Sequence, residues 1–121
     1  MEFIHQSQPN AKTCGQTVVA MIARVPVERV IELVGNKKTY PRDLRAALEF
    51  YGWEMGERGC CKLPMFPSLA AAMFCQTVSN HRLYGHWMLF TGSEVLDPSG
   101  IAKGCDVHPD WTGTFYSIRR K

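Results

Sequence analysis

The sequence of 121 residues has no apolar run near the roughly 18 residues that a membrane-spanning helix needs. Its start, residues 1–10, is polar and lacks the apolar segment of a secretion signal. The chain also has no large excess of positive or negative charge, because it contains 14 basic and 11 acidic residues and its net charge is only +3. These absences predict a cytoplasmic protein with no membrane segment, and they do not favour nucleic-acid binding.

The number and spacing of the five cysteines fit neither a set of disulfide bonds nor a structural zinc site. An odd count excludes complete disulfide pairing, and no two cysteines show the two-residue gap typical of zinc ligands. Cys60 and Cys61 are adjacent, which suits neither a bridge between them nor tetrahedral ligation. We therefore expect reduced thiols, most of them buried, with no metal and no organic cofactor.

What is present indicates one folded domain over residues 1–121. Hydrophobic residues make up 45% of the chain and charged residues 21%, which is the composition of a globular protein. The length suffices for a single hydrophobic core but not for two.

The first half of the chain predicts three helices. Thr13 and Gln16 have the spacing of a capping box, and apolar residues at helical spacing follow as far as residue 25. A second helix is predicted over 26–35 and a third over 41–52, because proline opens each segment and glycine closes it.

The second half predicts strands and turns. Glycines and prolines between residues 56 and 67 indicate short strands and loops. Four further strands are expected over 70–78, 85–91, 94–96 and 114–118. Helices followed by an antiparallel sheet indicate an α+β fold.

Cys14 lies at the start of the first predicted helix, where unpaired amide groups carry partial positive charge and favour a thiolate. A thiolate there suits covalent catalysis, and Gly15 has no side chain to block a substrate. Gln8 precedes the cysteine by six residues, so its amide could stabilise an oxyanion together with the Cys14 backbone N–H. Each residue taken alone also fits a purely structural role.

His86 and Asp97 lie on two strands that a hairpin would join. If Gly92-Ser93 forms a two-residue turn, the predicted opposite pairs are Thr91–Glu94, Phe90–Val95, Leu89–Leu96 and Met88–Asp97. His86 and Asp97 then become diagonal neighbours on one face, roughly 7 Å apart and within reach of a hydrogen bond. Such a carboxylate would orient the imidazole, whereas a one-residue slip would separate the two side chains.

These segments resemble the papain-like bacteriocin-processing peptidases, which cleave leader peptides after a double glycine. Residues 8–15, QPNAKTCG, are similar to the N-terminal motif of that family. Residues 85–90, GHWMLF, and 95–100, VLDPSG, are similar to its histidine strand and its Asp-Pro turn. The order cysteine, histidine, aspartate agrees as well, and so does the glutamine six residues before the cysteine.

The resemblance implies a papain-like fold with N-terminal helices packed on a C-terminal antiparallel sheet, and a cysteine peptidase that needs no cofactor. Cys14 would be the nucleophile, His86 the general base and then acid, Asp97 the orienting carboxylate, and Gln8 an oxyanion donor. Thr13 stands where the family often has an acidic residue. The expected substrate is therefore a peptide or protein of unspecified sequence.

Other interpretations of the same residues stay open. Isopeptide cleavage, glutamine deamidation and transamidation use the same triad, and a binding module could have the fold without the activity. Residues 26–52 also have a helix–turn–helix pattern with Lys37 and Lys38 in the turn, although the charge is modest. Residues 62–67 could form a substrate lip or a loop over the core, and His81 is the nearest alternative base. The sequence does not specify an oligomeric state.

Overall fold

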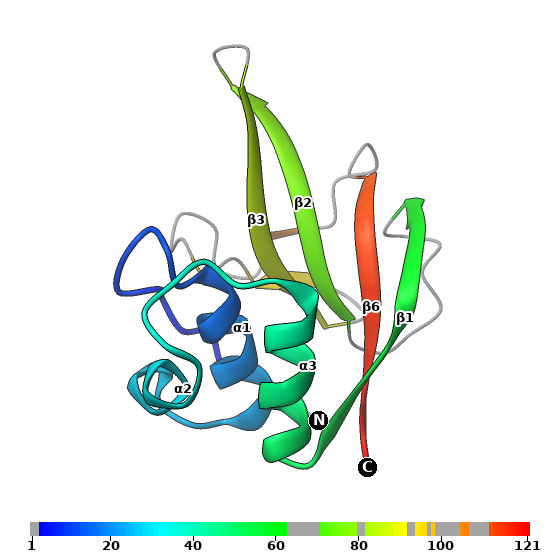
Figure 1. Cartoon of the computed structure of the whole chain (residues 1–121). Helices are drawn as coiled ribbons and strands as arrows, with labels where there is room; N and C mark the ends of the chain where they lie inside the picture. Colours follow the sequence, from blue (N-terminus) through cyan, green and yellow to red (C-terminus); the bar gives the residue numbers. More distant parts are fainter. Residues whose placement is uncertain are drawn as a thin grey trace.

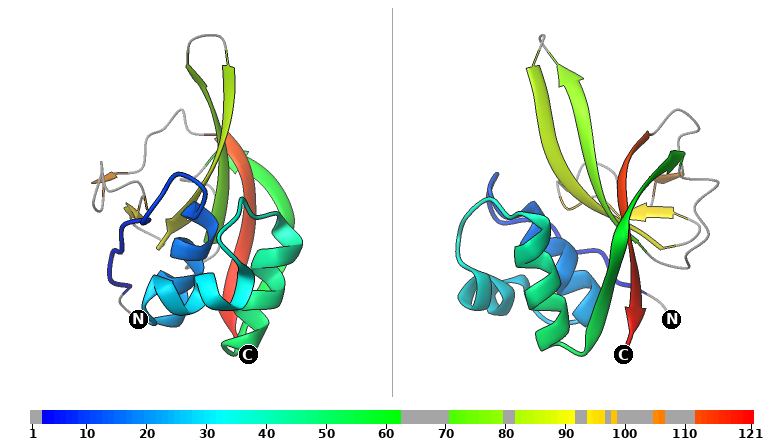
Figure 2. Two further views of the ribbon diagram at one scale, coloured as in Figure 1. Left: turned by 60° about the vertical axis from the view of Figure 1, so that its left-hand side comes forward. Right: turned by 45° about the vertical axis from the view of Figure 1, so that its right-hand side comes forward.

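The structure is a computed structural model that describes residues 3–62, 71–79, 82–91, 94–96, 98, 105–106 and 112–121. Within them, three helices precede six strands, and the helices lie together on one face of the sheet (Figures 1 and 2). The helices are α1 (Cys14–Ala23), α2 (Val27–Val34) and α3 (Pro41–Phe50). None of the helices in these ranges is both long and apolar enough to span a membrane.

The described strands form one antiparallel sheet in the order β1-β6-β2-β3-β4-β5. They are β1 (Trp53–Lys62), β2 (Ala71–Ser79), β3 (Arg82–Phe90), β4 (Glu94–Leu96), β5 (Cys105–Asp106) and β6 (Thr112–Arg120). The last strand, β6, lies between β1 and β2, so the end of the chain takes an interior position in the sheet (Figure 1). The predicted α+β class is confirmed.

All three predicted helices are confirmed, but the predicted capping box is wrong. Gly35 and Gly52 follow α2 and α3 with φ of 113° and 84°, a backbone region that favours glycine. At the start of α1, the Thr13 hydroxyl donates to the Asn10 carbonyl at 3.2 Å instead of accepting from the helix. The Gln16 amide reaches Gly35, because a carbonyl of the tertiary fold competes with the local cap.

The strands predicted over 70–78, 85–91, 94–96 and 114–118 are confirmed as β2, β3, β4 and β6. Strand β1 is longer than the sequence indicated. Its glycines suggested a break, yet the strand continues with a register shift between Met55 and Arg58. A Cβ at Gly56 would lie 2.1 Å from Ser117 Oγ on β6. This glycine therefore marks a close approach of two strands at a bulge.

Helix α1 forms the centre of the core. Five consecutive residues, Val18 to Ile22, are at most 1% exposed, so the helix is covered on every side. They pack in one cluster with Leu48 of α3, Leu89 of β3 and Ile118 of β6. The helix that begins at Cys14 is thus held by the rest of the described core.

Candidate active site

Cys14 is the first residue of α1, as the sequence predicted. Its thiol is partly buried and packs against the core. The first turn of α1 contains no acidic side chain, so no negative charge on that turn offsets the positive end of the helix. The positive end of the helix is the part of this environment that favours a thiolate.

The segment that carries Gln8 folds back against the start of α1. Gln8 Nε2 donates to the Asn10 carbonyl at 2.9 Å, and Thr13 Oγ1 donates to the same oxygen. Because a primary amide has two hydrogens, one N–H of Gln8 is left for a further acceptor. Gln8 Oε1 is buried and has no hydrogen-bond partner among the described residues.

The same segment is tied to the turn that follows β4. The backbone N–H of Gln8 donates to the carbonyl of Pro98 at 2.6 Å, and Pro98 is buried. Pro98 directly follows Asp97, which lies outside the described residues. The residue after the predicted carboxylate is therefore held against the segment that carries Gln8, a contact that no local sequence pattern signals.

The register that the sequence predicted for the hairpin of β3 and β4 is confirmed for the pairs Phe90–Val95 and Leu89–Leu96. His86 lies on β3, where its backbone pairs with that of Cys75 on β2, and its side chain is outside the described part of the structure. The shared face of His86 and Asp97 stays a prediction.

A single residue, Thr39, connects the neighbours of Cys14 and His86. Helix α1 packs against β3, and the Trp87 indole Nε1 donates to the Thr39 carbonyl at 3.3 Å. The Thr39 side chain lies against Gly15. Since Gly15 follows Cys14 and Trp87 follows His86, this contact brings the backbones of the two candidate residues toward one another.

Gly15 does not provide room for a substrate, contrary to the expectation from the sequence. It is buried, and a Cβ there would lie 2.0 Å from Thr39 Oγ1 and 3.1 Å from Leu44 Cδ2. We expect Gly15→Ala to lower the free energy of unfolding by about 1–3 kcal/mol, because packed interiors accommodate added methyl groups poorly. Urea denaturation of the variant and the wild type measures this difference.

The double variant Gly15→Ala/Thr39→Ala is the control for that measurement. It removes the Thr39 hydroxyl, which has no hydrogen-bond partner among the described residues. Two close contacts of the new Cβ remain, with Leu44 Cδ2 at 3.1 Å and with the Cβ of residue 39 at 3.2 Å. We expect part of the lost stability to return. Equal urea midpoints for Gly15→Ala and the wild type would contradict the packing role.

For several other residues noted in the sequence, the structure describes the backbone at most. The backbones of Cys60 and Cys61 belong to β1, and those of Cys75 and Cys105 to β2 and β5. Their side chains, His81 and the predicted lip beyond Lys62 are outside the described residues. In the described part of the chain, no three His, Cys, Asp or Glu side chains gather as a metal site.

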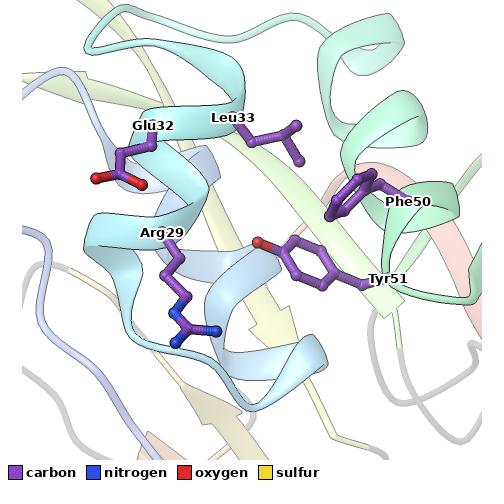
Figure 3. A pocket seen from close by; sticks show the side chains of 5 residues that line it. All are labelled: Arg29, Glu32, Leu33, Phe50 and Tyr51. Carbon is purple, nitrogen blue, oxygen red and sulfur yellow. The ribbon is translucent and has the colours of Figure 1, made fainter.

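A surface hollow of about 570 Å³ lies between α2 and α3, and no sequence pattern signals it. Arg29, Glu32 and Leu33 of α2 line one side, and Phe50 and Tyr51 line the other (Figure 3). Leu33 points toward the exposed ring of Phe50. The hollow contains no cysteine or histidine, so it is separate from the candidate active site.

No family model matches the sequence, and no curated protein is significantly similar to it. Among solved structures, the fold is similar to a double glycine motif protease from an AMS/PCAT transporter, solved in complex with the leader peptide. The TM-score is 0.78 at 16% sequence identity, over 99% of this chain and 93% of that chain. The predicted papain-like arrangement of helices on an antiparallel sheet is therefore confirmed.

Proposed function

We propose that the protein is a papain-like cysteine peptidase that resembles the double-glycine leader peptidases in activity as well as in fold. The observation that carries the proposal is the position of Cys14 at the start of the buried helix α1, against the strand that bears His86. The similarity to a double glycine motif protease over almost the whole chain supports it.

The proposed reaction begins with the Cys14 thiolate and the protonated imidazole of His86. The sulfur attacks the acyl carbon, and the oxyanion that forms accepts hydrogen bonds from the Cys14 backbone N–H and from Gln8 Nε2. His86 gives its proton to the departing amine, which leaves a thioester on Cys14. Water then attacks the thioester with His86 as the base, while Asp97 keeps the imidazole in the required tautomer.

The proposed substrate is a peptide with two consecutive glycines at the cleavage site. The similar protease was solved with the leader peptide, which favours a peptide over a small molecule. We place the reaction in the cytoplasm, because a reducing compartment keeps the nucleophilic thiol available. The proposed mechanism uses side chains and backbone of one domain and requires no metal, organic cofactor or nucleic acid.

Alkylation of the native protein with iodoacetamide at about pH 6 tests this proposal without knowledge of the substrate. We expect Cys14 to be modified stoichiometrically while the other four cysteines react more slowly, because the thiolate is the reactive form. Peptide mapping by mass spectrometry measures each site.

The same reaction in denaturant is the control, since all five cysteines should then react at similar rates. Equal modification of all five cysteines in the native protein would count against an activated Cys14.

A further inference from the structure

A buried glutamine holds the loop between α2 and α3 against the first turn of α1. Gln16 is fully buried, and its Nε2 donates to the carbonyls of Gly35 and Lys37 at 2.7 Å each. Both amide hydrogens are thus used on a single loop. Gln16 lies two residues after Cys14, so the loop is fastened to the same first turn of α1, on a different side of the helix from the candidate nucleophile.

The other end of this loop is fastened to β3. Thr39 presses its side chain against Gly15 and accepts the indole N–H of Trp87 on its carbonyl. Trp87 is 2% exposed, and its ring lies 5.9 Å from that of Tyr116 on β6, measured between centroids. Gln16, the loop and Trp87 therefore form a continuous connection from Cys14 to the residue beside His86.

The buried glutamine combines an oxygen that is unpaired within the described residues with two hydrogen bonds to one loop. An amide in the core loses hydration, and Gln16 Oε1 is buried with no hydrogen-bond partner among the described residues. An apolar side chain would avoid that cost but would leave the carbonyls of Gly35 and Lys37 without this donor. A glutamine at a fully covered position of α1 is thus better explained by the two carbonyls that it holds.

We infer that Gln16 is a positioning residue that sets the separation between the Cys14 thiol and the strand of His86, an inference that rests on the proposed function. The imidazole must come within hydrogen-bond reach of the sulfur, about 3–4 Å, to share its proton. A displacement of about 1 Å can cost roughly 100-fold in rate. Loss of the two bonds from Gln16 would release the loop and widen that separation.

The variant Gln16→Met tests this inference, because it keeps a long flexible side chain and removes the donor. We expect the pH midpoint of Cys14 alkylation to rise toward the ordinary thiol value of about 8.5. A rise of one pH unit corresponds to an alkylation rate about tenfold lower below the midpoint. The rate of iodoacetamide reaction, followed from about pH 5 to 9, measures this profile.

Gln6→Met is the matched control. Gln6 also makes two backbone bonds, but at the far end of α1: Nε2 donates to the Val25 carbonyl at 2.8 Å, and Oε1 accepts from the Val27 N–H at 3.1 Å. We expect this variant to lower the thermal midpoint while leaving the pH profile of Cys14 unchanged. A merely structural role for Gln16 would give the same pattern as Gln6.

The outcomes separate this inference from the proposed function. A folded Gln16→Met protein with the wild-type pH profile would overturn the positioning role and leave the peptidase proposal intact. An ordinary thiol profile in the wild type itself would overturn both. If Gln16→Met does not fold, Trp87→Phe removes the donor to Thr39 and keeps a ring beside Tyr116; an unchanged profile there would equally overturn the inference.

Discussion

Replacing Cys14 with alanine should abolish cleavage of a double-glycine peptide, with a loss of about 10⁴-fold or more. Without the sulfur no thioester can form, and the oxyanion donors alone supply only a small residual rate. Cys14 is only partly buried at the first residue of α1, so the fold should persist. Mass spectrometry of the peptide products measures the rate, and thermal denaturation checks the fold.

Cys14→Ser is the matched control for this prediction. Its hydroxyl occupies nearly the same space but ionises far less readily than a thiol, so the variant should also be inactive. Both variants should still bind the peptide, because the fold and the proposed oxyanion donors remain. Cleavage by Cys14→Ala at the wild-type rate would falsify the proposed nucleophile, whereas no cleavage by the wild type itself would favour the binding module that has only the fold.

Replacing His86 with alanine should lower the cleavage rate by a similar factor, about 10⁴-fold. It should also change Cys14 itself, because a protonated imidazole stabilises the neighbouring thiolate. Without that positive charge the thiol loses its proton only at higher pH. We therefore expect slow alkylation of Cys14 at about pH 6 and a midpoint near the ordinary value of about 8.5.

Two comparisons make the His86 result specific. His5→Ala changes a histidine of the N-terminal segment and should leave both the cleavage rate and the pH profile of Cys14 at wild-type values. The double variant Cys14→Ala/His86→Ala should be no slower than either single variant, because the two residues act as a unit. Near-normal cleavage by His86→Ala would exclude this histidine as the base and direct attention to His81.

Local signals in the sequence were sufficient for the elements and for part of the site. Helical periodicity with glycines at residues 35 and 52 predicted the helix ends, and Cys14 was correctly placed at the start of α1. Turn length alone predicted the pairs Phe90–Val95 and Leu89–Leu96. Each of these features depends on residues close together in the chain, where spacing and backbone preference determine the geometry.

Local signals failed where distant backbone groups compete for the same side chain. Thr13 and Gln16 have capping-box spacing, yet Gln16 bonds to carbonyls of the loop after α2. Gly15 looked like an opening for substrate, yet Thr39 occupies that space. Neither partner could be chosen from the sequence, because both arise only when α1 packs beside the loop.

The sequence by itself determined the fold class, the helix that presents Cys14 and the register of the strand that carries His86. Only the tertiary structure decided how these parts meet. The backbone N–H of Gln8 donates to the Pro98 carbonyl, and Thr39 lies between α1 and the indole of Trp87. The physical reason is that propensity and periodicity act over a few residues. A hydrogen bond between distant segments depends instead on where the core places both backbones.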